Sequence, residues 1–392
     1  MSKLSYLEKL LNEAKFEWKN LSDVARIKNG KDHKSLGEGK FPVYGSGGIM
    51  RYADNYAYNK SSVLIPRKGS LGNLFFVDVP FWTVDTIFYT EIDEAQIRPK
   101  YLYYFLTTVG LGDMNQAGGV PSQTQSVLNK LKIPVPCPEN PEKSLAIQAE
   151  IVRILDKFTA LTSELTAELA MRKKQYNYYR DQLLSFEEGE VEWKTLDEVA
   201  SFRRGSFPQP YGNSEWYNGE GCMPFVQVAD VADFGFRLHR STKQQISKLA
   251  QSKSVFVEAG TVIVSLQGTI GRVALTQYDC YVDRTLAIFT KYKAAVNKKY
   301  FAHQLKAKFD LEKEFARGST LKTITKEEFS KFQIPIPPLE VQNRIVALLD
   351  KFDRLTHSIE EGLPRELELR QKQYEYYREL LFSFPRPETA SN

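Results

Sequence analysis

The strongest constraint on this 392-residue chain is a long helix-forming stretch that occurs twice. The first copy, residues 147–186, contains no glycine or proline, and its apolar residues recur at spacings of three and four. This pattern predicts a long helix with the apolar seam of a coiled coil. The second copy covers residues 341–384 and repeats the LDKF and QY-x-YYR motifs. The seam residues expected to pack the helix pair are Ile151, Ile154, Phe158, Leu161, Leu165, Leu169, Ile345, Leu348, Phe352, Leu355 and Ile359.

The two copies differ in length by four residues. LDKF begins at 155 and 349, which are 194 apart, whereas the QY-x-YYR motifs begin at 175 and 373, which are 198 apart. Four residues add about one helical turn, or roughly 6 Å. Because Gly362 and Pro364 lie in the insertion, the sequence leaves open whether the second helix kinks there.

Each helix follows a globular segment, and these segments also share blocks in the same order. FEWKNLSDVARIKNG, residues 16–30, resembles VEWKTLDEVASFRRG, residues 191–205. Short runs rich in Val, Ile, Phe and Tyr predict strands in both segments. Residues 32–58 and 207–254, in contrast, look unrelated to each other. The pattern indicates one fold used twice, with different loops.

The expected fold class is α+β, with two similar domains joined by two long antiparallel coiled-coil helices. SYLEKLL, residues 5–11, echoes the ends of both helices, so we expect the N-terminal segment to pack near the C-terminal helix in a circular, pseudo-twofold arrangement. The expected segments are a first domain at 1–145, a central helix at 146–188, a second domain at 189–338 and a C-terminal helix at 339–392.

Positive charge lies outside the helices. The chain has a net charge of +5, but residues 146–188 carry −1 and residues 339–392 carry −2, which leaves +8 for the remainder. A basic surface supplies the sequence-independent part of nucleic-acid affinity. A solvated surface without a polyanion partner explains the charge equally well, so charge alone does not decide.

Other global features favour a cytoplasmic protein. No apolar run approaches 18 residues, and the N-terminus lacks a signal-peptide core. The three cysteines, Cys137, Cys222 and Cys280, are far apart, which fits a reducing compartment. With four histidines and none near a cysteine pair, a zinc site is not expected.

Motifs for catalysis are missing from the sequence. YGSGG, residues 44–48, lacks the strand–GxGxxG–helix context of a nucleotide site and predicts a loop. There is no GxxxxGK[ST] loop, no HExxH and no Asn/Asp-Pro-Pro-aromatic tetrad. Asp85 and Asp283 sit at matching positions in VDT and VDR, but no second carboxylate or lysine recurs with them at nuclease-like spacing. The favoured interpretation is that these carboxylates accept structural hydrogen bonds.

Several loop residues suit contact with DNA. Arg and Lys can read guanine, and Gln and Asn can read adenine, although each residue taken singly favours a phosphate contact. The pairs Tyr178–Tyr179 and Tyr376–Tyr377 could serve as stacking platforms, but on a helix seam packing is favoured. The DNA-binding candidates are Arg67, Lys68, Asn73, Gln116, Gln123, Gln125, Arg203, Arg204, Gln267, Arg272, Arg284, Arg317 and Lys322.

This arrangement resembles the specificity (S) subunit of type I restriction–modification systems, over nearly the whole chain. The paired helices and the N-terminal MSKLSYLEKLL carry the resemblance. Residues 138–186 are similar to the IC subgroup, in which T-x-E-L tetrapeptides repeat in the spacer; TSEL and TAEL occupy residues 162–169. The recognition loops match no member residue by residue, so base contacts are not carried over.

The resemblance implies a non-catalytic reader of double-stranded DNA. Each target-recognition domain would bind one half of a split, asymmetric target, and the helices would hold the halves apart and dock two methyltransferase (M) subunits. The M subunits would supply S-adenosylmethionine chemistry on adenine, and restriction (R) subunits would add translocation and cleavage that need ATP and Mg. No cofactor or metal is expected in this chain.

Two other function classes stay open at this point. A stand-alone DNA methyltransferase or nuclease would need a cofactor or metal constellation that the sequence does not reveal. A coiled-coil scaffold would bind proteins only. Methyl transfer by the purified chain would favour the first, and failure to bind random-sequence DNA at low salt, even with M subunits, would favour the second.

Overall fold

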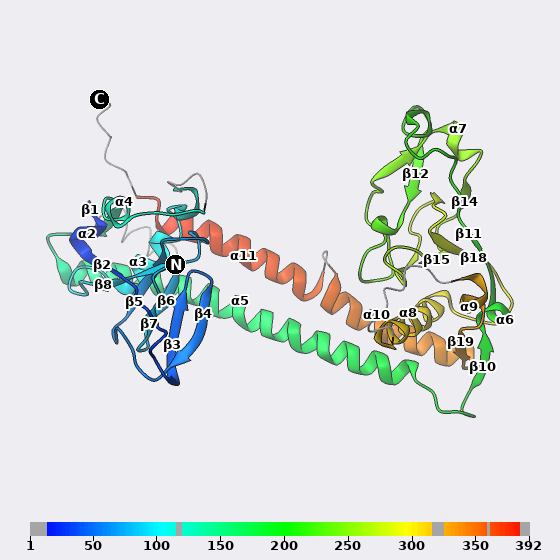
Figure 1. Cartoon of the computed structure of the whole chain (residues 1–392), viewed down its shortest axis with the longest axis horizontal. Coiled ribbons are helices and arrows are strands. Elements are labelled where there is room, and N and C mark those ends of the chain that lie inside the picture. Colours follow the sequence, from blue (N-terminus) through cyan, green and yellow to red (C-terminus); the bar gives the residue numbers. More distant parts are fainter. Residues whose placement is uncertain (1–13, 115–119, 316–324, 359–360, 385–392) are drawn as a thin grey trace, which may run out of the picture. The chain divides into compact units, whose positions relative to one another are not determined.

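The computed structural model describes residues 14–114, 120–315, 325–358 and 361–384. The chain separates into two compact units (Figure 1). The first unit comprises residues 1–164 and 369–392, and the second comprises residues 165–368. The division therefore cuts through the long helices, whereas the sequence suggests segment boundaries at the ends of the helices.

The first unit contains a small α+β domain. Its elements are β1 (Phe16–Asn20), α2 (Leu21–Val24), β2 (Ala25–Asn29), β3 (Glu38–Gly45), β4 (Gly48–Ala53), β5 (Ser62–Pro66), β6 (Phe75–Val77), β7 (Trp82–Thr83), β8 (Ile87–Ile92), α3 (Pro99–Leu106), η1 (Leu111–Asp113), α4 (Gln125–Leu128) and β9 (Lys132–Pro136). An antiparallel sheet has the order β2-β8-β5-β6, a second sheet has the order β4-β3-β7, and β1 pairs with β9. All five residues of β5 are buried, because one face of this strand lies under α3 and the other faces the aromatic cluster around Phe81.

The second unit repeats this plan. Its elements are β10 (Glu192–Thr195), α6 (Leu196–Val199), β11 (Ala200–Arg204), η2 (Ser214–Trp216), β12 (Met223–Val226), η3 (Val228–Asp230), β13 (Gln244–Ile246), α7 (Lys248–Gln251), β14 (Val255–Val257), β15 (Val262–Ser265), β16 (Val273–Leu275), β17 (Cys280–Val282), β18 (Leu286–Tyr292), α8 (Lys298–Phe315), α9 (Lys326–Ser330) and β19 (Gln333–Ile336). The sheet β11-β18-β15-β16 corresponds to β2-β8-β5-β6, and the pair β10–β19 corresponds to β1–β9. The predicted duplication of one α+β fold is present in the structure.

Three helices form the long repeated stretches. They are α5 (Pro141–Leu184), α10 (Leu339–His357) and α11 (Gly362–Leu381). Figure 1 draws α5 as one unbroken ribbon of 44 residues, whereas the second stretch is divided into α10 and α11. The division falls at the four-residue insertion, where Gly362 has a φ of +77°. In the described part of the chain, no helix is long and apolar enough to cross a membrane.

Both domains use a buried tyrosine to hold the strand that precedes the following helix. The Tyr101 hydroxyl donates to the Pro134 carbonyl at 2.9 Å, and the Tyr300 hydroxyl donates to the Pro335 carbonyl at 3.0 Å. Each phenol is 0% exposed, so these hydrogen bonds satisfy groups that water cannot reach. The two tyrosines are 199 residues apart, which is also the offset between Pro66 and Ser265 at matching positions of β5 and β15.

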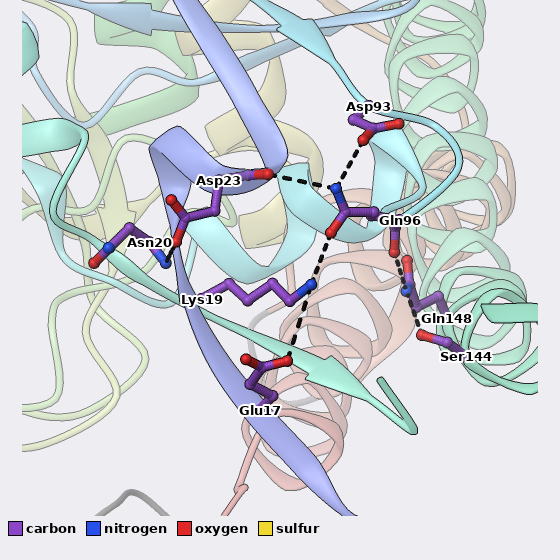
Figure 2. A network of polar contacts seen from close by, with 8 residues as sticks. All are labelled: Glu17, Lys19, Asn20, Asp23, Asp93, Gln96, Ser144 and Gln148. Carbon is purple, nitrogen blue, oxygen red and sulfur yellow. Dashed lines mark hydrogen bonds and ion pairs between the residues drawn. The ribbon is translucent and has the colours of Figure 1, made fainter. Parts of the chain in front are cut away.

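A polar network around Gln148 joins the first domain to the start of α5 (Figure 2). Gln148 is fully buried, accepts a hydrogen bond from the Arg98 backbone at 2.8 Å and donates to the Gln96 carbonyl at 3.0 Å. The Gln96 side chain accepts from the Lys19 ammonium at 2.8 Å, which extends the network to β1. In the second domain the buried Gln342 accepts from the backbone of Asn297 at 2.8 Å in the same way.

The seam predicted for the helix pair matches the buried face only in part. The Phe158 ring stacks on Tyr377 in the first unit, with centroids 5.3 Å apart, and Phe352 stacks on Tyr179 in the second, with centroids 5.7 Å apart. Ile151 and Ile345 are buried in clusters that contain residues of a domain and of the facing helix, and Ile154, Leu165 and Leu169 are half-buried. Leu161, Leu348 and Leu355 are 36–38% exposed, and Ile359 lies outside the described residues.

The physical reason is that each helix packs against two partners, a domain and the facing helix. Near the domains Leu155 and Leu349 are also fully buried, one residue after the predicted Ile154 and Leu348. The buried face there meets the domain core as well as the other helix. A period of 3.5 residues cannot reveal this second contact, because it assumes that one seam continues along the whole helix.

Candidate nucleic-acid interface

Loops of the first domain meet at the end of β5. Gly69 donates to the Pro121 carbonyl at 2.9 Å, and Lys68 forms an isolated β-bridge with Ser122. The tip of the β3–β4 hairpin approaches them, because a Cβ on Gly69 would lie 3.4 Å from the Ser46 hydroxyl. The YGSGG segment is therefore a hairpin turn, as the sequence predicts a loop there.

The predicted DNA-contact residues at this turn differ in how their side chains are held. Arg67 is half-buried, its backbone donates to the Thr86 carbonyl at 2.9 Å, and its guanidinium lies 5.2 Å from the centre of the Phe88 ring. Lys68 and Asn73 are exposed at the turn. Their side chains can therefore reach a ligand in solution without rearrangement of the core.

The glutamines of the predicted QAGGVPSQTQ loop separate into three cases. Gln123 is only 2% exposed and donates to the Pro66 carbonyl at 2.6 Å, so its side chain supports the turn and is withdrawn from the DNA-contact candidates. Gln125 is half-buried and donates to the Asn29 side chain at 3.2 Å. Gln116 lies outside the described residues.

The second domain has a corresponding turn, and backbone hydrogen bonds show which of its residues match those of the first domain. The Leu266 backbone donates to the Thr285 carbonyl at 2.9 Å, and this hydrogen bond is equivalent to the one from Arg67 to Thr86 in the first domain. Strand β17 also pairs with β12 in parallel, as β7 pairs with β3. These contacts make Asp283 the structural equivalent of Val84, and Arg284 the equivalent of Asp85.

The alignment of Asp85 with Asp283 is therefore wrong by one residue. The shared tripeptide pattern suggested that alignment, but strand register decides which residues are equivalent. The register places the buried Val84 and the buried Asp283 at the same position of the fold. Asp283 accepts hydrogen bonds from the Thr285 backbone at 2.9 Å and from the Tyr211 hydroxyl. The interpretation of this carboxylate as a structural acceptor is confirmed, while Asp85 is exposed.

An aromatic and cationic cluster surrounds this turn. The Arg284 guanidinium is exposed and lies 5.3 Å from the centre of the Tyr211 ring, which stacks on Phe207 at 4.9 Å. Burial and the hydrogen bond to Asp283 raise the pKa of Tyr211, so the phenol stays protonated and donating. Lys253 lies over the Trp216 ring at 4.9 Å nearby in the same domain. Cations beside aromatic rings are typical of nucleic-acid surfaces.

The remaining predicted residues of this domain have different surroundings. Arg203 and Arg204 are exposed at the end of β11, and Gln267 is half-buried. Arg272 pairs with Asp233 at 2.6 Å and donates to the Val231 carbonyl at 3.0 Å, so it fastens a loop of its own domain. Arg317 and Lys322 lie outside the described residues.

Sequence reasoning missed members of the aromatic and cationic cluster in the second domain and exposed residues of β4 in the first. Tyr211, Trp216 and Lys253 lie in residues 207–254, and the exposed Met50 and Tyr52 of β4 lie in residues 32–58. These are the two stretches that differ between the copies. Divergence within a shared framework was the signal that could have identified them.

Comparison with known proteins decides the family. The family model described as type I restriction modification DNA specificity domain matches residues 13–171 and again residues 188–369. The chain is 41% identical over its whole length to the complete EcoR124I/EcoR124II specificity subunit of Escherichia coli.

The chain belongs to the type I restriction–modification specificity subunits. It is also 33% identical to the EcoprrI specificity subunit of Escherichia coli, over 92% of this chain and 93% of that one. Among solved structures, the type I S subunit of M. genitalium superimposes with a TM-score of 0.60 at 17% identity, over 96% of this chain and 98% of the other. This likeness confirms the fold, and the sequence relatives establish the family.

Proposed function

We propose that this specificity subunit is the DNA-recognition chain of a type I restriction–modification complex, and that each domain reads one half of a bipartite, asymmetric target. The observation that carries the proposal is a common framework with divergent loops. Both domains use the same strand order in the main sheet and the same anchoring tyrosine, while the sequences of residues 32–58 and 207–254 look unrelated. Two such domains can recognise two different short sequences.

The turn residues are assigned to DNA contact. Lys68 and Asn73 in the first domain and Arg284 in the second are exposed on loops that a rigid sheet supports, and Arg203 is exposed at the end of β11. Lys and Arg can neutralise phosphates or read guanine in the major groove, and Asn can read adenine. The +8 charge of the regions outside the helices supports the same assignment.

The helices are assigned the role of a spacer. Helix α5 has 44 residues and therefore extends about 66 Å. Two sites on one face of a duplex lie about 34–36 Å apart for each helical turn. A continuous helix of this length is sufficient to hold two half-sites at a fixed gap.

Assembly with methyltransferase and restriction subunits follows from the family, and we assign two M subunits to each chain. Tyr178 on α5 and Tyr376 on α11 are equivalent in the repeat, and each is 62% exposed. The exposed Met171 and Leu380 lie on the same two helices. Large apolar side chains at equivalent exposed positions fit two copies of one partner. The interpretation of these tyrosines as packing residues holds only for Tyr179 and Tyr377, which stack on the phenylalanines of the facing helices.

Type I specificity subunits are non-catalytic, and catalysis is placed in the partners. In this proposal the M subunits bind S-adenosylmethionine, the R subunits use ATP and Mg, and this chain binds none of them. Incubation of the purified chain with labelled S-adenosylmethionine and DNA should transfer no methyl group. Methyl transfer would instead identify an enzyme.

The assignment of one half-site to each domain can be tested by separate loop variants. Methylome sequencing of cells that carry this chain with its M subunits gives the target. Binding of the M–S complex is then measured on duplexes in which one half or the other is scrambled. Lys68→Ala with Asn73→Ala should reduce discrimination of one half by about tenfold or more, and Arg203→Ala with Arg284→Ala should do so for the other half.

A matched control is Lys132→Ala, which removes an exposed cation of β9 outside the turn. This variant should retain discrimination of both halves. Loss of both halves in either loop variant, or of neither, would contradict the division of the target between the domains.

A further inference from the structure

A cavity of about 410 Å³ lies within the second unit and is separate from the loops assigned to DNA. Its walls come from the end of α5, from α8, from the last turns of α10 and from the loop that contains Phe234. Its volume falls in the roughly 300–1,000 Å³ range of small-molecule sites in proteins. Two of the four histidines of the chain, His303 and His357, line it.

His303 has an unsatisfied polar atom. It is only 3% exposed, and its Nδ1 finds no hydrogen-bond partner in the part of the chain that the structure describes. Burial lowers the pKa of this histidine to about 3, so the ring is neutral near pH 7. A neutral imidazole in a cavity can form one hydrogen bond with a ligand through its unpaired ring nitrogen. A buried polar atom without a partner destabilises the protein, and a ligand that bonds it would remove that penalty.

The repeat shows why the cavity exists in this unit. The residue equivalent to His303 in the first domain is Tyr104, because Lys100 and Lys299 make equivalent ion pairs four residues earlier. The Tyr104 phenol reaches α5, donates to Asp156 at 2.7 Å and lies 3.3 Å from the Thr159 hydroxyl. The shorter imidazole of His303 leaves that space open.

The walls combine planar rings with cations and with the carboxylates of Asp233 and Asp353. Phe234 lies parallel to the His357 ring, with centroids 4.5 Å apart, and Phe234 is itself 58% exposed. Arg180 and Lys306 also line the cavity, and each already has one acidic neighbour. Arg180 donates to Asp181 through Nε and Nη2, and a guanidinium has five N–H donors, so it keeps further donor capacity. Rings suit stacking on a planar group, and the cations suit an anion.

We propose that this cavity binds a nucleoside monophosphate, with the base among the aromatic rings and bonded to His303, and the phosphate at Arg180 and Lys306. A heteroaromatic base is required rather than a plain ring, because only a ring with polar atoms can satisfy His303. The ligand would join the recognition domain to the last turn of α10, where the second helical stretch is interrupted. The site is independent of the DNA-reading role proposed above.

The test is calorimetric titration of the full-length chain with AMP, adenosine and inorganic phosphate. AMP should bind saturably at one site, and adenosine and phosphate should each bind about tenfold more weakly or less. His303→Tyr copies the residue of the first domain and should fill the cavity and abolish binding. Phe234→Ala removes an exposed ring and should weaken binding without unfolding the chain. His239→Gln, at an exposed histidine outside the cavity, should bind AMP like the natural chain.

Three results would overturn the proposal. The first is no AMP binding by the folded natural chain. The second is binding that survives unchanged in His303→Tyr, or in Phe234→Ala should the tyrosine variant fail to fold. The third is phosphate or adenosine binding as tightly as AMP, since the ring or the anion would then contribute nothing.

Discussion

At the scale of single residues, the two domains share glycines at positions where a side chain would not fit. A Cβ on Gly30 would lie 1.9 Å from the Val84 carbonyl oxygen, and one on Gly205 would lie 2.1 Å from the Val282 carbonyl oxygen. Both glycines follow the repeated strand of the ARIKNG and ASFRRG blocks, and both allow two backbones to approach closely. Exposed turn residues such as Lys68 and Arg284 can instead differ between the two domains.

We predict that Gly30→Ala and Gly205→Ala each lower the free energy of unfolding by about 3 kcal/mol or more, because the added methyl group meets backbone that cannot rotate away. Gly47→Ala and Gly212→Ala are the matched controls, since a Cβ at either position meets nothing within 4 Å. Urea denaturation of the full chain measures all four. Equal stability of the Gly30 and Gly47 variants would show that the close approach is not required.

At the scale of elements, the two helical stretches are homologous but not alike. Helix α5 is continuous, whereas α10 ends at His357 and α11 begins at Gly362. A Cβ on Gly362 would lie 2.4 Å from the Arg354 carbonyl oxygen, so the chain needs glycine for this interruption. In both units the same aromatic stack connects facing helices, through Phe158 in one and Phe352 in the other.

For this stack we expect a coupling of about 0.5–1.5 kcal/mol in a double-mutant cycle of Phe158→Ala and Tyr377→Ala. Phe352 with Tyr179 should give a similar value, because both pairs have an interplanar angle of 27°. Chemical denaturation of the single and double variants supplies the cycle. Phe158 combined with Tyr178, about 30 Å further along α5, should be additive; coupling there would indicate a change of the whole helix instead.

At the scale of the whole molecule, a duplicated framework separates the choice of bases from the distance between them. The loops that differ lie within the domains, and the T-x-E-L units at 162–169 lie within α5, away from either sheet. A change in one should therefore leave the other intact. This separation follows from continuous helical geometry, in which each added residue contributes a fixed rise.

Insertion of a third T-x-E-L unit after Leu169 should lengthen the gap between the two half-sites without altering either half. Four residues add roughly 6 Å and about 40° of rotation to the helix. Methylome sequencing of cells that carry the longer chain reads the gap and both halves together. A control insertion of four residues into the exposed Glu187–Glu190 turn, outside α5, should leave the gap as it was. An unchanged gap with the longer spacer would show that the helix does not set it.

The sequence alone determined the duplication, the α+β class, the long helices and the family resemblance, because periodicity and repeated blocks are local properties that survive without coordinates. It also identified exposed turn residues such as Lys68 and Arg284. Only the tertiary structure decided that Gln123 is buried, that Asp283 replaces Val84 and that the buried face of each helix meets a domain as well as the facing helix. The physical reason is that burial, strand register and helix rotation depend on which distant surfaces meet. The cavity at His303 arises in the same way, since a shorter side chain creates space only where a phenol would have reached the neighbouring helix.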